Sequence, residues 1–119
     1  MTNKIISNQE FCGVAETVRI IGRKWTLLIL KELFTGTKRF NQLQRSLNGI
    51  SPRTLSQRLK QMEDDKILVK KIFAEVPPHV EYSLSDKGYS LSRIIGDMRT
   101  WGEHEHEEAA HHVREAVPA

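Results

Sequence analysis

Between residues 38 and 62 the chain reads KRFNQLQRSLNGISPRTLSQRLKQM, and this stretch decides the fold. Its first half carries apolar residues at the spacing of one helix face, which predicts a short helix from about Asn41. These apolar residues are Phe40, Leu43 and Leu47. Asn48-Gly49 is a strong turn signal. Ser51-Pro52 then starts a second helix, because serine caps a helix and proline is tolerated in its first turn. The stretch therefore predicts two short helices joined by a turn.

The second predicted helix has two different faces. On a helical projection at about 100° per residue, Leu59 and Met62 lie within about 40° of Leu55, so these three side chains face a core. The opposite face carries donors and no carboxylate until the run Glu63-Asp64-Asp65 ends the helix. Arginine and glutamine read guanine and adenine edges, and lysine and hydroxyl groups suit phosphates, so this face favours DNA. An ordinary amphipathic surface helix is the alternative. The outward side chains are Arg53, Gln57 and Lys60, with Thr54, Ser56 and Gln61 at the flanks.

Two more helices are predicted before this stretch. Residues 25–34 are apolar almost all round, which is typical of a short helix in the middle of a core. Gly36 suits the cap that ends it. An earlier helix ends at Gly22, and its apolar residues recur at helical spacing. They are Phe11, Val14, Val18 and Ile21.

After the stretch the period changes from helical to two. Residues 67–73 and 80–84 predict strands, and Pro77-Pro78 places an exposed loop between them, because proline donates no hydrogen bond to a ladder. Ser85-Asp86-Lys87 caps a last helix. The sequence thus predicts a mainly α protein with a small β-hairpin. Two short helices joined by a glycine-containing turn and followed by a hairpin form a winged helix-turn-helix.

Length, charge and cysteine content bound the remaining possibilities. The 119 residues predict a single domain over 1–119. No signal peptide is recognisable, and the longest apolar run is far short of the ~20 residues that cross a bilayer. One cysteine excludes an intrachain disulfide, so we expect a cytoplasmic protein. Residues 36–80 carry a net charge of +5 and residues 81–119 a net charge of −4. The middle could face a polyanion, although a mildly basic solvated surface explains the charge equally well.

Catalytic and metal-binding signals are weak. We find no carboxylate pair, Ser-His-Asp set, phosphate-binding glycine loop or Cys-His pair at workable spacing, and we expect neither an enzyme nor a cofactor. In the Glu/His-rich stretch near the C-terminus, His104, Glu108 and His111 or His112 share a helical face. Such spacing can hold a metal. A solvated helix end is the commoner structure for such a stretch, so no metal site is predicted.

Several stretches resemble the HxlR family of bacterial transcription regulators, which are MarR-like. They are IGRKW (21–25), KRFN (38–41), GIS (49–51), LSQRL (55–59) and VPPHVEYSL (76–84), the last followed by SDKG (85–88). The resemblance covers about residues 11–102 and leaves 103–119 as a polar tail. It implies a homodimer of winged-helix subunits that binds inverted-repeat operator DNA, with the second helix of the motif in the major groove. Family members often have a second glycine where Arg23 stands and an arginine where His79 stands.

The predicted DNA contacts lie on the motif and the wing. Lys38 and Arg39 precede its first helix and could grip a phosphate, while Lys70, Lys71 and His79 could place charge on the wing. A solvated surface role is the alternative for each residue taken singly. The full set is Lys38, Arg39, Ser51, Arg53, Thr54, Ser56, Gln57, Arg58, Lys60, Gln61, Lys70, Lys71 and His79. A winged-helix protein-interaction module remains the alternative function, although its recognition helix is usually not cationic.

The first and last helices predict a dimer interface. The last helix carries an apolar stripe with a mean period near 3.5, and the other helices already supply a core. The stripe could also fold back onto its own subunit; the family resemblance favours the dimer. The predicted interface residues are Phe11, Val14, Val18, Leu91, Ile94, Ile95, Met98 and Trp101.

Cys12 is the residue with latent redox chemistry. The resemblance implies sensing of oxidants or electrophiles through a cysteine near this position. Such sensing requires an exposed thiol with a lowered pKa. Cys12 lies near a predicted helix N-terminus, whose partial positive charge favours the thiolate. A small buried hydrophobic residue is the alternative role. An oxidant or small-molecule effector is therefore an open expectation, and the operator and the direction of regulation are not encoded in any recognisable pattern.

Overall fold

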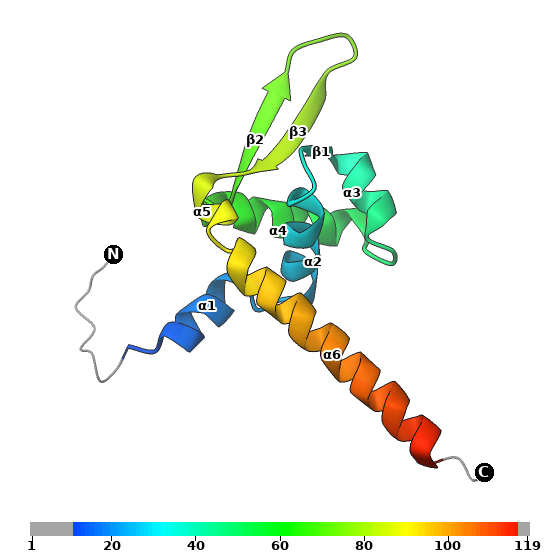
Figure 1. Ribbon diagram of the computed structural model, residues 1–119. Helices are drawn as coiled ribbons and strands as arrows, with labels where there is room; N and C mark the ends of the chain where they lie inside the picture. The colour runs from blue at the N-terminus through cyan, green and yellow to red at the C-terminus, as the bar shows by residue number, and fades with distance from the viewer. Residues whose placement is uncertain (1–10, 117–119) are drawn as a thin grey trace.

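The computed structural model describes residues 11–116, with side chains up to His111. Six helices and three strands follow one another in this part of the chain (Figure 1). In order they are α1 (Gly13–Ile21), α2 (Lys24–Leu33), β1 (Lys38–Arg39), α3 (Phe40–Ser46), α4 (Pro52–Asp64), β2 (Leu68–Phe73), β3 (His79–Leu84), α5 (Asp86–Tyr89) and α6 (Ser92–Ala116). None of the helices described is long and apolar enough to cross a bilayer. The predicted mainly α fold with a small antiparallel sheet is confirmed.

The core lies around α2. Ile29, Leu30 and Leu33 of this helix are fully buried, and α2 packs against α3, α4 and β3. Leu43 of α3 and Leu55 of α4 close the same core. Residues 25–34 are apolar almost throughout because other elements surround this helix on most sides, as predicted for a helix in the middle of a core.

The turn between α3 and α4 requires its glycine. Gly49 has a φ of 94°, in a region that favours glycine because side chains clash there. Ile50 follows and is buried, and its N–H donates to the carbonyl oxygen of Leu47 at 3.1 Å. The turn is thereby tied to the core on one side, and α4 starts from a fixed position.

The hairpin belongs to a small sheet that the sequence only partly predicts. β2 and β3 pair in antiparallel register from Leu68↔Leu84 to Phe73↔His79. Residues 38–39 add the strand β1 on the other side of β3, giving the order β1-β3-β2. Beyond this sheet the hairpin extends away from the helices as the wing (Figure 1).

The sequence predicts one last helix after the hairpin, whereas the structure has two, α5 and α6. Ser85 caps α5, its hydroxyl oxygen accepting the N–H of Gly88 at 3.1 Å. Gly88 is buried so close to the carbonyl oxygen of Ile67 that an added Cβ would lie 2.3 Å from it. This contact holds α5 against the start of β2, and the chain turns at residues 90–91 before α6 begins. α6 then continues through residue 102 to Ala116, so most of the expected tail is helical.

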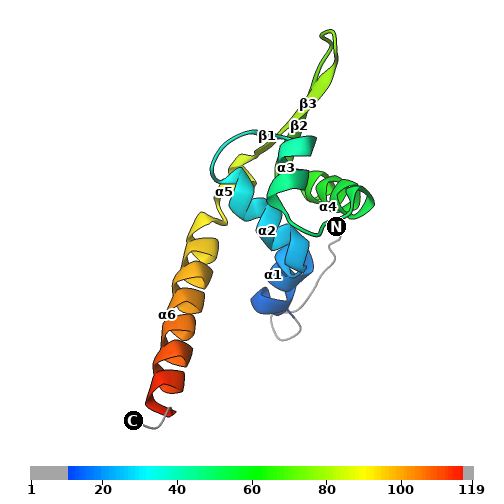
Figure 2. The ribbon, with the colours of Figure 1, turned by 90° about the vertical axis from the view of Figure 1, so that its right-hand side faces the viewer.

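α6 divides its apolar residues between two directions. Ile95 is 8% exposed and belongs to the core of its own subunit, and Leu91, just before α6, packs against that core. Ile94, Met98 and Trp101 are exposed. Figure 2 shows α6 leaving the helical body, with its later turns far from the other elements. Part of the predicted stripe thus folds back onto its own subunit, which was the alternative considered for it.

Candidate nucleic-acid interface

The first turn of α4 is fixed by its cap. The hydroxyl oxygen of Ser51 accepts the backbone N–H of Thr54 at 3.0 Å, and the same hydroxyl donates to Oγ1 of Thr54 at 2.9 Å. Pro52 occupies the first helical position, as the sequence predicts. Ser51 and Thr54 are therefore engaged in starting the helix, and any contact they make with DNA comes in addition to this cap.

The outward face of α4 has the predicted composition. Leu55, Leu59 and Met62 are buried, while the opposite side chains stand in solvent. Thr54 and Arg58, on one flank, are half-buried. The exposed residues are Arg53, Ser56, Gln57, Lys60 and Gln61. The helix thus presents donors along its first turns and is anchored by the face behind them.

The end of α4 is less basic than its start. Nζ of Lys60 lies 2.8 Å from a carboxylate oxygen of Asp64, one turn later on the same exposed face. The hydrogen bond that Nζ donates to this carboxylate raises the pKa of Lys60. Both side chains are largely exposed, so the pair contributes little to stability. Its consequence is electrostatic, because Asp64 offsets the charge that Lys60 would offer to a polyanion.

A contact that sequence reasoning missed lies on the flank of α4. Nη1 of Arg23, from the corner between α1 and α2, donates to Oε1 of Gln61 at 3.1 Å. Nη1 of Arg58 lies 3.5 Å from the same oxygen. The sequence alone indicates only that Arg23 stands where family members often have a second glycine. No local periodicity signals a contact between residues 38 positions apart.

The entrance to α3 carries the second group of predicted residues. Lys38 and Arg39 form β1, where Lys38 pairs with Tyr82 and Arg39 with Glu81. The backbone N–H of Arg39 donates to Oε1 of Gln42 at 2.8 Å, which fixes the start of α3 and leaves the guanidinium exposed. Lys38 is half-buried.

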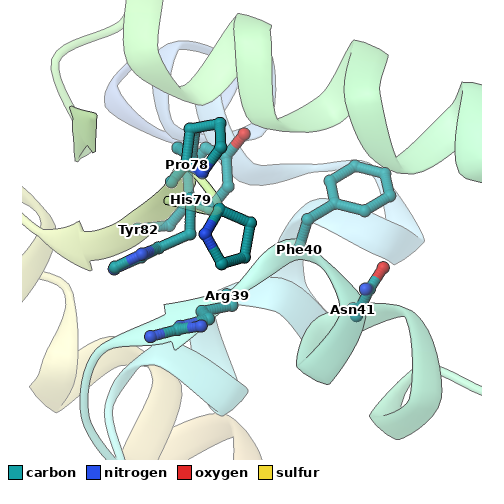
Figure 3. A pocket seen from close by; sticks show the side chains of 8 residues that line it. Arg39, Phe40, Asn41, Pro78, His79 and Tyr82 are labelled. Atoms are coloured by element: carbon teal, nitrogen blue, oxygen red, sulfur yellow. The ribbon is translucent and has the colours of Figure 1, made fainter. Parts of the chain in front are cut away.

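A hollow of about 520 Å³ separates this entrance from the wing. Figure 3 shows the rings of Phe40, Pro78 and Tyr82 around it, with the guanidinium of Arg39 at the edge. Residues of the α3 entrance line one side of this hollow, and residues of the wing line the other.

The wing holds His79 more tightly than expected. Its ring stacks on Phe73, with centroids 4.6 Å apart, and its two nitrogens lie 3.4 Å from a carboxylate oxygen of Glu75 and 3.2 Å from one of Glu81. The His79 side chain is only 14% exposed. Lys70 and Lys71 are exposed, and Nζ of Lys71 lies 5.0 Å from the Phe73 ring centroid. The cations available on the wing are therefore the lysines, and His79 organises the hairpin.

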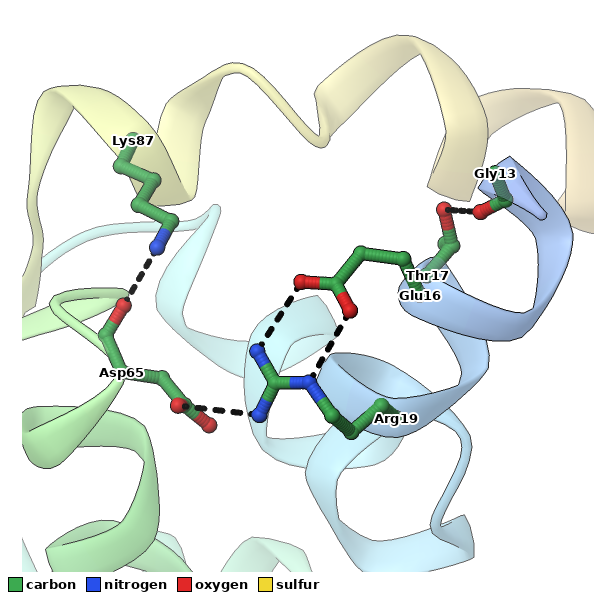
Figure 4. Close-up of polar contacts among 6 residues, drawn as sticks. All are labelled: Gly13, Glu16, Thr17, Arg19, Asp65 and Lys87. Carbon is green, nitrogen blue, oxygen red and sulfur yellow. Dashed lines mark hydrogen bonds and ion pairs between the residues drawn. The ribbon is translucent and has the colours of Figure 1, made fainter. Parts of the chain in front are cut away.

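Cys12 lies at the N-cap of α1, and its thiol is exposed. Its Sγ accepts the N–H of Ala15 at 3.4 Å. At the other end of α1, Arg19 binds Glu16 and reaches Asp65 at 3.7 Å, just beyond α4 (Figure 4). The backbone oxygen of Asp65 also accepts Nζ of Lys87 at 2.8 Å. Polar contacts therefore tie α1 and α5 to the C-terminal end of α4.

The described residues hold no group of three or more His, Cys, Asp or Glu side chains able to bind a metal. His104 and Glu108 lie exposed on α6, as does His111. His112 falls outside the residues whose side chains the structure describes.

Comparisons with known proteins match the chain to one family model and to helix-turn-helix transcriptional regulators. The profile of the HxlR-like helix-turn-helix family matches residues 20–110. An uncharacterized HTH-type transcriptional regulator of Bacillus subtilis (strain 168), YybR, is 38% identical over 99 residues, or 83% of this chain and 79% of YybR. The solved structure of the redox regulator HypR in its reduced form has a TM-score of 0.79 and 34% identity, covering 83% of this chain and 98% of HypR. The solved structure of the reduced transcriptional regulator YodB of B. subtilis has a TM-score of 0.69 and 31% identity, covering 78% of this chain and 92% of YodB.

Proposed function

The chain belongs to the HxlR-like helix-turn-helix family and is a helix-turn-helix transcriptional regulator, and we propose that it binds inverted-repeat operator DNA as a homodimer. The observation that carries the proposal is the face of α4. Its first turns expose Arg53 and Gln57 with no carboxylate beside them, and buried leucines hold the helix from behind. Such a helix can enter a major groove with its N-terminal residues on base edges.

We assign different tasks to the predicted contacts. Arg53 and Gln57 are placed to read base edges, because their planar groups can form bidentate hydrogen bonds with guanine and adenine. Lys38 and Arg39 lie at the α3 entrance and Lys70 and Lys71 on the wing, where charge suits phosphates. The remaining predicted contacts, which flank or cap α4, are Ser51, Thr54, Ser56, Arg58, Lys60 and Gln61. His79 has its ring nitrogens beside two carboxylates, so we assign it a supporting role in the wing.

Arg53→Ala tests the placement of α4. Fragments are first selected by the purified natural chain from random DNA, and affinities are then measured on the selected duplex and on a scrambled one. The variant should lose ~1–3 kcal/mol on the selected duplex and relax the preference at one base pair. Arg99→Ala, on exposed α6 and away from α4, is the matched control and should leave the preference intact. Unchanged binding of the selected duplex by Arg53→Ala would contradict this placement.

The exposed apolar residues of α1 and α6 support a homodimer. Phe11, just before α1, and Val14 and Val18 of α1 are more than half exposed in the single chain. Ile94, Met98 and Trp101 of α6 are exposed as well. Several exposed apolar side chains on one helix mark a candidate interaction surface, and α1 and α6 each carry such a set. A twofold axis through such a surface presents two copies of α4, with half-sites one helical turn apart or a multiple of it.

We propose that the chain responds to oxidants or electrophiles through Cys12. Two observations bear on it: the thiol is exposed at the start of α1, and one structurally similar protein is named a redox regulator. Oxidation of Cys12 would change the size and polarity of the group that accepts the N–H of Ala15 and caps α1. α1 is linked through Arg19 to Asp65 at the end of α4, so a shift of α1 can reach the reading helix. The cytoplasm, where the chromosome of a bacterial cell lies, is the compartment we propose.

A further inference from the structure

We propose that Arg23 and Arg58 form a phosphate-binding groove on the flank of α4, which holds a DNA backbone phosphodiester next to the bases that α4 reads. This inference rests on the proposed function, since it adds a contact to the same DNA surface. Arg23 lies outside the helix-turn-helix and outside the contacts predicted from the sequence.

The groove has a volume of about 450 Å³ and is lined by Arg23, Ser56, Gln57, Arg58, Lys60 and Gln61. Three of these six side chains are cations, and none is a carboxylate. Lys60 already has a partner in Asp64, whereas neither Arg23 nor Arg58 forms an ion pair within the part of the chain that the structure describes. Two guanidinium groups gathered without a counter-charge repel each other, and a bound anion relieves this repulsion.

Hydrogen bonding supports the same conclusion. A guanidinium has five N–H donors and no acceptor. Here both arginines point one Nη1 at the same neutral oxygen, Oε1 of Gln61. Nε of Arg58 is buried and has no hydrogen-bond partner among the described residues. Most donors of the pair thus have no partner among the described residues, and planar arginine donors match phosphate oxygens well.

The backbone fixes Arg23 in this place. Gly22 ends α1 so tightly that an added Cβ would lie 2.4 Å from the carbonyl oxygen of Val18. Arg23 follows as the N-cap of α2, with an extended backbone and no side-chain capping bond, so its side chain is free to cross to α4. There it lines the same groove as Gln57, one of the residues assigned to the bases. An anion at this point is therefore the phosphate of a strand whose groove α4 occupies.

The test compares Arg23→Gln with the natural chain on the selected duplex and on a random duplex over a series of salt concentrations. Loss of one phosphate contact lowers the slope of log affinity against log salt by ~0.9 per subunit. Relative to the affinity at 1 M salt, this difference in slope corresponds to a roughly eightfold loss of DNA affinity per subunit at about 0.1 M salt. Both duplexes should lose affinity equally, because a phosphate carries no sequence information. Arg23→Lys keeps the charge and should restore most of the slope.

Two further variants keep the outcome decisive. Arg99→Gln removes the same charge from exposed α6 and should leave the slope unchanged. Arg58→Gln removes the other arginine of the groove and should lower the slope in the same way, so the inference stays testable if Arg23→Gln folds poorly. An unchanged slope in folded Arg23→Gln, with sequence-selective binding intact, overturns this inference and leaves the proposed function standing. Absence of DNA binding by the natural chain overturns both.

A second arm distinguishes DNA from a free anion. The melting temperature of the natural chain and of Arg23→Gln is measured in sodium phosphate and in sodium chloride of equal ionic strength. Little difference between the salts is expected, because a single phosphate ion lacks the neighbouring contacts of a duplex. A phosphate-specific rise that Arg23→Gln abolishes, with no change in the DNA slope, would assign the groove to a free anion and overturn the DNA contact.

Discussion

Met98→Asp on α6 should separate the proposed dimer without unfolding its subunits. Met98 is 47% exposed in the single chain, so an interface has about half of this side chain left to bury. Full burial of a methionine contributes about 1.5–3 kcal/mol, so the exposed half contributes roughly 1 kcal/mol. A twofold interface counts this twice, giving about 2 kcal/mol, and burying two new carboxylates adds to the penalty. The dimer Kd should therefore rise at least ~30-fold.

Sedimentation velocity over a concentration series measures that constant, and circular dichroism checks that the subunit stays folded. Thr100→Asp is the matched control: it places the same carboxylate on α6, at an exposed position on another side of the helix. It should leave the Kd close to that of the natural chain. Operator affinity should fall for Met98→Asp and not for Thr100→Asp. A Met98→Asp chain that remains as tightly dimeric as the natural one would refute the placement of the interface.

Four further outcomes are expected. Ser51→Ala should cost about 1 kcal/mol of unfolding free energy in urea, since it removes the acceptor for the N–H of Thr54, while Ser51→Asn should largely preserve it. Ile95→Ala should cost about 2–5 kcal/mol because the side chain is in the core, whereas Ile94→Ala should chiefly weaken association. Burial, together with the charge of Glu63, raises the pKa of Tyr82 above its usual value of 10.0, so the folded state favours the neutral phenol. Stability should then fall as pH rises above about 10, and Tyr82→Phe should flatten this loss in urea titrations between about pH 8 and 11. After diamide treatment, operator binding should change in the natural chain and not in Cys12→Ser; equal responses would reduce Cys12 to a capping residue.

Regular periodicity explains what the sequence could predict. Leu55, Leu59 and Met62 recur as a helix demands, and a helix buried on one face must expose Arg53 and Gln57 on the other. Both follow from local spacing alone. The two strands of the wing follow in the same way from alternation and from the prolines between them.

Contacts between distant segments could not be predicted by such reasoning. β1 comprises two polar residues whose strand conformation comes from pairing with β3. The sequence indicates that His79 could place charge on the wing or stand in solvent, but the strand register places it opposite Phe73 and beside Glu81. Arg23 meets Gln61 only because α1 and α2 form a tight corner next to α4. Each of these depends on tertiary packing, which spacing along one segment does not encode.

α6 shows why the fold and the proposed assembly are coupled. Ile94 and Ile95 are adjacent, and neighbours on a helix point about 100° apart, so one stripe cannot include both. The structure turns Ile95 into the core and leaves Ile94 outward with Met98 and Trp101. The first turns of α6 are therefore anchored in the body that carries α4, and the exposed stripe extends from that anchor. α1 reaches the same body separately, through Arg19 and Asp65 at the end of α4. A dimer formed through α1 and α6 would thus set the distance between its two reading helices through the contacts of both helices with the body that carries α4. We expect a displacement of α1 by chemistry at Cys12 to alter that distance without unfolding either subunit.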